Sequence, residues 1–290
     1  MNEVSPLKKR IKRAQLAQKH IDLFQCPICN ESMKLHEFKS LLCLNKHTFD
    51  FAKQGYVHLT TRANDRLYTR KLFEARRKMI LSSAIYDPLH QVLSEAIESI
   101  SLKNVLDAGS GEGSHLHRLI ESRQQSFELS VGLDLSKEGI KLAATHDENK
   151  LWVVGDLANL PFTKQSFDCI LSILSPSNYQ EFKRILTPNG IVIKVVPGRY
   201  YLQELRQHFN DQPTSYSNSE TTSLFNENFN LINKHKLSYQ VSLLEDQMKS
   251  LLEMTPLLWK ASKSEKEDFI MKSQNRITID LDLLIGIARD

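Results

Sequence analysis

Three alternating glycines and a later acidic residue are spaced as a nucleoside-binding unit requires. Residues 107–113 read Asp-Ala-Gly-Ser-Gly-Glu-Gly directly after the apolar run 104–106, and a second apolar run ends in Asp134. Gly109, Gly111 and the glycine that follows have no Cβ, so the backbone can turn tightly there and approach a ligand closely. A carboxylate at the end of the next strand, such as that of Asp134, can accept hydrogen bonds from two ribose hydroxyls. The pattern therefore predicts a strand, a glycine turn, a helix and a ribose-binding acid in succession.

The order of the glycines distinguishes this turn from a dinucleotide-binding turn. A dinucleotide fingerprint reads Gly-x-Gly-x-x-Gly, whereas here the glycines alternate and Asp107 precedes them. This variant resembles motif I of the class I methyltransferases, which bind S-adenosylmethionine (SAM). The resemblance implies SAM as the cofactor and a Rossmann-like doubly wound sheet as the fold. Two roles are open for Asp107: it holds the glycine turn, or it contacts the methionine amino group of the cofactor.

Four residues near the N-terminus have the spacing of a zinc site. Cys26 and Cys29 form a C-x2-C pair, and Cys43 and His47 form a C-x3-H pair after a gap of thirteen residues. Each pair can sit on a tight turn, and two such turns complete a tetrahedral Cys3His site with no open position. We therefore predict a structural zinc ion, which supplies free energy that the small β-rich segment around it lacks. The alternative, four unrelated residues with a redox-type C-x-x-C, leaves the second pair unexplained.

Composition limits the class of protein. The chain has 290 residues, of which 41% are hydrophobic and 25% charged, as is ordinary for a soluble globular protein. No apolar stretch approaches the ~18 residues of a membrane span, and the basic N-terminus lacks the apolar centre of a secretory signal. Cysteines are too few for a disulfide framework, and three of them beside a histidine point to metal in a reducing compartment. We therefore expect a cytoplasmic protein without membrane contact.

Two basic clusters suggest a polyanionic partner. The net charge is only +4, but residues 8–19 hold six Lys or Arg and no acid. Residues 62–78 hold seven Lys or Arg against two acids. Contact with RNA explains both clusters, and a pair of solvated helix faces is the alternative.

The apolar patterns divide the chain into four parts. We expect a basic N-terminal helix over 1–23, a zinc-binding RNA-recognition module over 24–60, a helical linker and cofactor lid over 61–100, and a methyltransferase domain over 101–290. In the linker, a basic first part and a break near Asp87-Pro88 precede an amphipathic helix.

Strands and helices alternate after residue 104, which predicts a doubly wound parallel sheet. The expected strands cover 105–108, 129–133, 151–154, 167–174, 191–196, 229–243 and 277–288. The expected helices cover 114–123, 137–144, 179–186 and 244–252. A turn at 187–190 should precede the fifth strand, and the Ser-, Thr- and Asn-rich residues 210–226 should form a flexible surface loop.

In an open parallel sheet, ligands bind beyond the carboxyl ends of the strands. Asp156 and Leu157 follow the third strand, where a carboxylate and a backbone N–H can meet the adenine amino group and a ring nitrogen. A simple turn residue is the alternative for Asp156. Ser175, Asn178 and Tyr179 follow the fourth strand, and in this fold that position faces the methyl group of SAM. Tyr179 either packs in the core or stacks on the target base.

Beyond residue 23 the chain resembles the bacterial large-subunit rRNA guanine-N1 methyltransferases over nearly its whole length. The matching motifs are Phe24-x-Cys26-Pro27-x-Cys29, Cys43-x3-His47, Phe49-Asp50-x-Ala52-Lys53-x-Gly55-Tyr56-Val57-x-Leu59, Ala75-Arg76-Arg77, Leu106-Asp107-x-Gly109-x-Gly111-Glu112-Gly113, Leu133-Asp134-x-Ser136-Lys137, Leu160-Pro161-Phe162, Pro197-Gly198 and Met254-Thr255-Pro256-x2-Trp259. The resemblance implies that the zinc module grips an rRNA stem-loop and that the C-terminal domain methylates N1 of one guanine. It also implies cofactor contacts at Tyr86, Gly111-Glu112 and Tyr201.

The segment after the fourth strand resembles the Gram-positive branch of that family. Its motif is Ser175-Pro176-x-Asn178-Tyr179-x-Glu181-Phe182. The resemblance implies a target guanine in the loop of helix 35 of 23S rRNA, which is associated with resistance to tylosin and related macrolides. Family members often carry a charged residue where Ser172 stands and a bulky aromatic residue near Ser114-His115. These departures leave the placement of the substrate open.

Guanine N1 carries a proton, so its methylation requires that the proton leaves or that the enolate on O6 is stabilised. We take Ser175 and Asn178 as the residues that position the base, with water or a backbone carbonyl as the proton acceptor; Glu112 is a further candidate. Two other functions fit parts of the sequence: SAM-dependent methylation of a small molecule, and a non-catalytic rRNA-binding assembly factor that retains SAM for stability. The zinc module is also a candidate contact for a homodimer.

Overall fold

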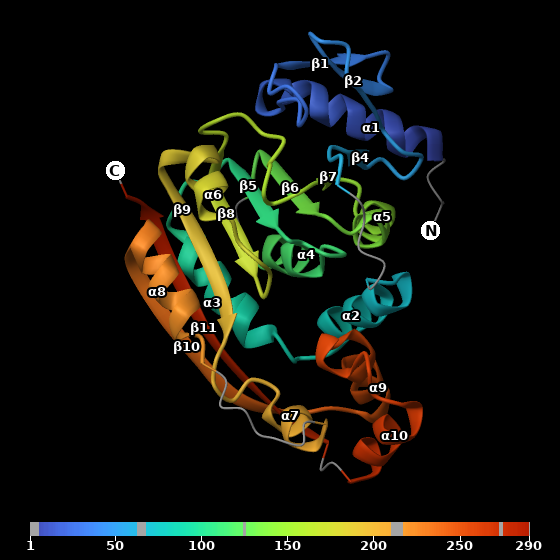
Figure 1. The fold of residues 1–290 in the computed structure, drawn as a ribbon, viewed down its shortest axis with the longest axis vertical. Coiled ribbons are helices and arrows are strands. Elements are labelled where there is room, and N and C mark those ends of the chain that lie inside the picture. Colours follow the sequence, from blue (N-terminus) through green and yellow to red (C-terminus); the bar gives the residue numbers. More distant parts are fainter. Residues whose placement is uncertain (1–5, 63–67, 124–125, 210–216, 273–274, 290) are drawn as a thin grey trace.

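An eight-stranded sheet forms the centre of the protein, with the strand order β10-β11-β9-β8-β5-β6-β7-β4 (Figure 1). The computed structural model describes residues 6–62, 68–123, 126–209, 217–272 and 275–289. The strands of this sheet are β4 (Val57–His58), β5 (Asn104–Ala108), β6 (Leu129–Asp134), β7 (Leu151–Val154), β8 (Phe167–Ile173), β9 (Leu186–Pro197), β10 (Phe229–Ser242) and β11 (Arg276–Ala288). Strands β4 to β9 pair in parallel, and β11 and β10 continue the sheet antiparallel at one edge. The predicted doubly wound α/β sheet is therefore confirmed, with an antiparallel pair added.

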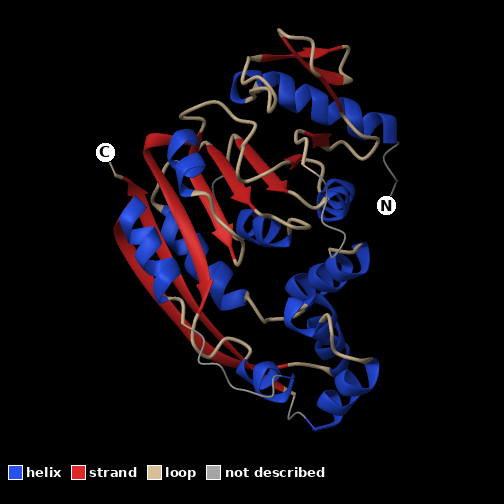
Figure 2. Cartoon of the chain, viewed as in Figure 1, coloured by secondary structure: helices blue, strands red, loops and turns tan. Residues whose placement is uncertain are grey.

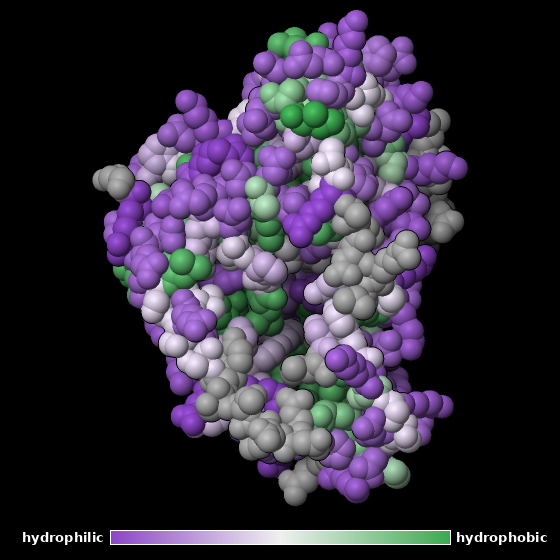
Figure 3. Space-filling model, in the orientation of Figure 1, coloured by the Kyte–Doolittle hydropathy of each residue, from purple (hydrophilic) through white to green (hydrophobic). Residues whose placement is uncertain are grey.

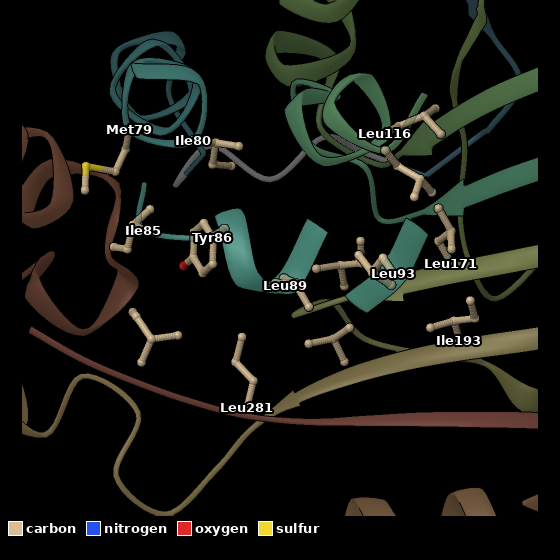
Figure 4. Packing of buried hydrophobic residues seen from close by; sticks show 14 of the residues in the cluster. Met79, Ile80, Ile85, Tyr86, Leu89, Leu93, Leu116, Leu171, Ile193 and Leu281 are labelled. Carbon is tan, nitrogen blue, oxygen red and sulfur yellow. The ribbon is translucent and has the colours of Figure 1, made fainter. Parts of the chain in front are cut away.

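Helices cover both faces of this sheet. Those whose apolar side chains join one buried cluster are α3 (Asp87–Glu98), α4 (Ser114–Glu121) and α5 (Lys137–His146). Those of the opposite cluster are α1 (Pro6–Lys19), α6 (Tyr179–Ile185) and α8 (Ser219–Asn228). Figure 4 shows α3 lying along the sheet, with Leu89 and Leu93 directed at Leu171, Ile193 and Leu281 of the strands. The order of strands reverses between β5 and β8, so the ligand-binding end of the sheet lies at that switch.

The N-terminal module is joined to the main sheet. Its elements are η1 (Ile21–Leu23), β1 (Met33–His36), β2 (Ser40–Cys43) and β3 (Thr48–Asp50), and the three strands pair antiparallel. The next strand, β4, leaves the module and pairs in parallel with β7. Phe24 also packs against Phe162, with ring centroids 5.9 Å apart. The small module thus shares one apolar core with the sheet, which compensates for the few apolar residues of its own.

The remaining helices lie toward one end of the sheet (Figures 1 and 2), and their apolar side chains join the same buried cluster as those of α3, α4 and α5. They are α2 (Arg70–Ser82), α7 (Gln203–Phe209), α9 (Glu245–Met254), η2 (Pro256–Leu258) and α10 (Lys263–Lys272). Thr69 caps α2, because its hydroxyl accepts a hydrogen bond from the N–H of Leu72 at 3.3 Å. Two ion pairs join α2 to α9, Lys71 with Glu253 and Lys78 with Asp246.

The predicted break near Asp87-Pro88 is confirmed, since α2 and α3 are separated by residues 83–86; Pro88 itself lies in the first turn of α3, where a missing N–H removes no helical hydrogen bond. Two other expectations about local structure were wrong. The expected turn at 187–190 lies within β9, where a shift in the β8–β9 register leaves these residues unpaired with β8. Residues 219–228 form α8 because Phe225 is buried against Tyr179 and Phe229, and such packing overrides weak helix propensity. The part of that predicted loop over 210–216 lies outside the described residues.

Among the described residues, none of the helices combines the length and the apolar character that crossing a membrane demands.

Candidate functional site

The glycine turn lies between β5 and α4, at the carboxyl end of the central strand. Gly109 and Gly111 have φ values of +83° and +58°, a region that favours glycine. The N–H groups of Gly109 and Ser110 both donate to the carbonyl of Leu133 in the neighbouring strand. A Cβ on Gly109 would lie 2.5 Å from the Cβ of Ser175. Glycine is thus required at this position both for the backbone conformation and for the close approach of the loop after β8.

The predicted ribose acid also holds this turn. Asp134 accepts a hydrogen bond from the N–H of Gly111 at 2.8 Å and another from the N–H of Ser136 at 2.7 Å. Burial raises the pKa of the Asp134 carboxyl, and these two N–H groups oppose that rise. Each carboxylate oxygen has a second lone pair. The structure therefore orients Asp134 beside the turn and leaves it able to accept further hydrogen bonds.

Four buried polar atoms at the turn have no hydrogen-bond partner within the described part of the chain. They are Asp107 Oδ2, Ser110 Oγ, Glu112 Oε1 and Ser114 Oγ. Burial raises the pKa of Asp107 to about 7. Buried polar groups without partners are costly, so several at one turn indicate a missing polar ligand. The amino acid moiety of SAM, with its ammonium and carboxylate groups, fits this set of donors and acceptors.

Arg76 of α2 lies over the same turn, although the sequence predicted it only as a member of the basic cluster over 62–78. Its guanidinium pairs with Glu112 and donates to the carbonyl of Ser110 at 3.4 Å. Its charge also acts on Tyr86 and Tyr201, whose hydroxyl oxygens are 2.6 Å apart. Tyr86, Glu112 and Tyr201 thus converge on one side of the turn, although they come from three distant segments.

Asp156 and Leu157 lie in the turn after β7, as predicted. The Asp156 carboxylate accepts from Arg62 at 3.2 Å and from the N–H of Ala158 at 2.9 Å. Leu157 is partly buried against the core. The carboxylate therefore forms a local turn in this structure, and contact with adenine stays a prediction.

The predicted acceptor loop follows β8 and touches the glycine turn. Ser175 donates from its hydroxyl to the carbonyl of Ala108 at 2.8 Å, and Asn178 caps α6 by accepting from the N–H of Glu181 at 3.2 Å. Ser172 Oγ lies 3.0 Å from the hydroxyl oxygens of both Ser175 and Ser177. The loop therefore presents a connected set of hydroxyl groups next to the cofactor turn.

Tyr179 packs in the core. Its ring is buried, with centroid distances of 5.4 to 6.1 Å to the rings of Phe182, Phe225 and Phe229. Of the two roles left open for this residue, packing is therefore the one that the structure supports.

The four predicted metal ligands come together in the N-terminal module. Their ligand atoms all lie within 4.8 Å of one another. Cys29 Sγ is 3.7 Å from Cys43 Sγ, and His47 Nδ1 is 3.5 Å from Cys26 Sγ and 3.4 Å from Cys43 Sγ. Tetrahedral zinc with Zn–S bonds of about 2.3 Å and Zn–N bonds of about 2.0 Å gives S···S distances of roughly 3.8 Å and S···N distances of roughly 3.5 Å. The residues present therefore fit a zinc ion in a structural site whose four positions are all filled by the protein.

Acids partly neutralise both basic clusters. Acids engage five side chains of the second cluster: the pairs are Arg62–Asp156, Arg70–Glu74, Lys71–Glu253, Arg76–Glu112 and Lys78–Asp246. Arg66 lies outside the described residues. In α1, Lys9 and Lys12 both pair with Glu148, Lys8 and Lys19 are exposed, and Arg13 is buried, which lowers its pKa to about 10. Exposed lysine side chains are therefore present on both α1 and α2.

Comparison with known proteins matches both parts of the chain. A model of the methyltransferase domain matches residues 100–260, and a model of the RlmA N-terminal zinc ribbon matches residues 24–60. YxjB of Bacillus subtilis, named as a 23S rRNA (guanine-N(1)-)-methyltransferase, is 39% identical over 273 residues, which cover 91% of this chain and 97% of YxjB. The 23S rRNA (guanine(748)-N(1))-methyltransferase of Streptomyces fradiae is 33% identical over 62% of this chain and 65% of its own length.

Among solved structures, a SAM-dependent methyltransferase from Thiobacillus denitrificans, in complex with S-adenosyl-L-homocysteine, is 14% identical and has a TM-score of 0.48. It covers 79% of this chain and all of its own length. The similarity to YxjB extends through the zinc ribbon and the methyltransferase domain alike, and both domain models agree with the zinc and cofactor geometry. The chain belongs to the SAM-dependent 23S rRNA (guanine-N1)-methyltransferase family, with the zinc ribbon of that family at its N-terminus.

Proposed function

We propose that this protein transfers a methyl group from SAM to N1 of a guanine in the loop of helix 35 of 23S rRNA. The observation that carries the proposal is the contact of the Ser175 loop with the glycine turn, which places a polar acceptor loop beside the cofactor cradle. The names of YxjB and the Streptomyces fradiae relative support guanine N1 as the target atom, and the second name supports position 748. A contribution to macrolide resistance follows from that site.

The chain's own residues would act mainly by orientation. Asp134 would hold the ribose of the cofactor, and Asp107, Glu112 and Arg76 would hold its charged amino acid end. SAM supplies an electrophilic methyl group when it is bound. Holding both reactants in line lowers the barrier by up to several kcal/mol. The target base must also leave its stack, which a hairpin loop makes easier.

We propose that the loop over 175–178 positions the guanine. Asn178→Ala is expected to lower the single-turnover methylation rate at least ~10-fold, because a hydrogen-bonding side chain at the base is lost. The same change removes the cap of α6, which costs about 1 kcal/mol of stability. Asn178→Ser retains a capping oxygen and separates the two effects: it should restore the melting temperature but not the rate. A wild-type rate in Asn178→Ala would exclude this role.

We propose that α1 and the zinc module bind the RNA backbone. A groove of about 540 Å³ lies between α1 and the loop after α5, and its lining includes Lys12, Gln15, Gln18, Lys19, Phe38 and Asn149 together with Glu148, which pairs with Lys12. Hydrophilic residues cover most of the face shown in Figure 3, including the part around α1. Lysines with an accessible aromatic ring suit phosphates and an unpaired base. A cytoplasmic location agrees with this substrate, and a homodimer through the zinc module stays a prediction.

The proposed function predicts one modified nucleotide. Because N1 methylation blocks the Watson–Crick edge, reverse transcription of 23S rRNA should stop in the helix 35 loop in cells with the gene and read through in a deletion strain. The purified protein with SAM should restore the stop on rRNA from the deletion strain. An unchanged pattern of stops would instead favour a small-molecule substrate, as with the demethylmenaquinone methyltransferase of Thermotoga maritima, which matches 41% of this chain.

A further inference from the structure

A buried lysine lies beneath the acceptor loop. Lys194 of β9 is only 4% exposed. Its ammonium nitrogen donates to Ser172 Oγ at 3.1 Å and to the carbonyl oxygen of Ser175. In the sheet, Lys194 pairs with Ser172 of β8 on one side and with Leu284 of β11 on the other. Its hydrogen-bond partners are thus two neutral oxygen atoms, one at the end of β8 and one in the loop that borders the cofactor turn.

The titratable groups on the surrounding elements have other partners or face solvent. They are Asp168 on β8, Tyr179, Glu181, Lys183 and Arg184 on α6, Glu220 and Glu227 on α8, and Asp280 and Asp282 on β11. The partner of the Tyr179 hydroxyl is Ser177, and Asp280 accepts from the N–H of Tyr200. Asp282 stands two residues from Leu284, the register partner of Lys194, and it accepts from Asn218 and pairs with Lys234. Burial without a paired carboxylate lowers the pKa of Lys194 to about 8. A substantial fraction of this side chain is therefore a neutral amine near pH 7.5.

A chain of hydroxyl groups leads from this amine to the loop surface. Ser172 Oγ is 3.0 Å from Ser177 Oγ, and Ser177 is partly exposed. The Ser175 hydroxyl is already committed as a donor to the carbonyl of Ala108. Ser177 is therefore the hydroxyl best placed to meet a base that enters from outside.

We propose that Lys194 is the final acceptor of the guanine N1 proton, which reaches it through Ser177 and Ser172. This proposal rests on the proposed function, because it assigns the proton step of guanine N1 methylation. In the neutral state, the two amine hydrogens can retain the Ser175 carbonyl while the nitrogen lone pair accepts from Ser172. Since Lys194 acts through the serines, it does not itself touch the base.

The step is balanced in atoms and charge. The N1–H bond breaks as Ser177 accepts the proton, and each hydroxyl passes its own proton onward until Lys194 becomes an ammonium ion. The electron pair left on N1 forms the bond to the methyl group, and the electron pair of the broken C–S bond stays on sulfur. The positive charge of the cofactor is thereby replaced by that of Lys194, which later returns its proton to water.

Substitution of Lys194 by arginine and by methionine distinguishes two possible roles of this residue, that of a proton acceptor and that of a positive charge that holds the loop. Arginine keeps the charge and the donors but cannot accept a proton near neutral pH. Both Lys194→Arg and Lys194→Met should lower the single-turnover methylation rate ~10²-fold, as for the loss of a general base. The wild-type rate should rise with pH and level off near the Lys194 pKa of about 8, and this break should vanish in both variants. Ser172→Ala should also slow the reaction, because it interrupts the relay.

The matched control is Lys150→Arg, since Lys150 is equally buried but pairs with Asp147 away from the loop. Its pH profile should match that of the wild type. A readout independent of activity is the NMR titration of lysine Cε signals, in which one signal that is absent from Lys194→Arg should titrate near pH 8. Melting temperature and SAM affinity report whether each variant is folded.

Two results would overturn the relay: a wild-type rate in Lys194→Arg, or titration of the Lys194 signal near the normal lysine value. Recovery by arginine alone would establish a clamp in place of a base. If the wild-type protein failed to methylate the guanine at all, the proposed function itself would be wrong, and the relay with it. The failure of the relay alone is recognised by an active wild type with unaffected Lys194 variants.

Discussion

Replacement of Cys43 by serine is expected to abolish zinc binding and to unfold the region around β1, β2 and β3. Cys43 Sγ contacts both Cys29 Sγ and His47 Nδ1, so its loss opens the tetrahedral site. Binding of structural zinc contributes on the order of 10–16 kcal/mol to small zinc modules. The variant should therefore show rapid amide exchange over residues 26–50 and a loss of RNA affinity of at least ~10²-fold. Zinc content, hydrogen exchange and RNA titration measure these effects.

Cys169 provides the matched control for this experiment. It is a buried cysteine in β8, remote in sequence from the zinc ligands, and burial raises its pKa well above the ordinary range. Cys169→Ala removes a thiol from the core and should lower stability by about 1–2 kcal/mol, but zinc content and amide protection over 26–50 should not change. SAM affinity should persist in both variants. Full zinc content in Cys43→Ser would show that the predicted ligand set is wrong.

The spacing of residues in the sequence could predict both the cofactor-binding turn and the zinc site, because each is built from residues that lie close together in the chain. The glycines directly follow Asp107 and the end of β5, and Asp134 ends the next strand, β6. Parallel strands bring such ends to one edge of the sheet, so position in the chain becomes position in space. The four zinc ligands likewise fall within a short segment. What the spacing could not show is that Asp134 also holds the turn through the N–H of Gly111.

Long-range pairing was the part that spacing could not predict. Val57 and His58 belong to the zinc ribbon by sequence, yet they pair with β7, nearly one hundred residues later. The charges of the second basic cluster are neutralised by acids that lie far away in the chain, such as Glu253 and Asp246. The local net charge of the sequence therefore overstates how many basic side chains lack an acidic partner. The same holds for α1, where Lys9 and Lys12 both pair with Glu148, more than one hundred residues later in the chain.

Lys194 was missed for a similar reason. It interrupts the apolar run of β9, and this interruption was the one feature of the sequence that could have pointed to a buried lysine. A single lysine in a strand is usually read as an edge or solvent-facing residue, however, and β9 lies inside the sheet. Its register partner, Ser172, accepts a hydrogen bond from Lys194, so the two residues form one polar contact within the sheet.

Replacement of Asp134 by alanine is expected to weaken SAM binding at least ~10²-fold. Two hydrogen bonds from ribose hydroxyls to a carboxylate contribute about 1.5–3 kcal/mol each. The same change frees the N–H groups of Gly111 and Ser136, so the turn itself should loosen. Calorimetric titration with SAM measures the affinity, and thermal unfolding without ligand measures the cost to the fold.

The control variant Asp168→Ala shows whether Asp134→Ala weakens SAM binding through lost contacts with the ligand or through lost contacts with the backbone. Its carboxylate also accepts from two backbone N–H groups, those of Lys103 and Asn104, but at the opposite end of the sheet. Asp168→Ala should therefore destabilise the protein to a similar extent and leave SAM affinity unchanged. If both variants lost SAM binding equally, the effect of Asp134 would be a general loosening of the sheet. If neither did, Asp134 would hold the glycine turn only, and the ribose would be bound elsewhere.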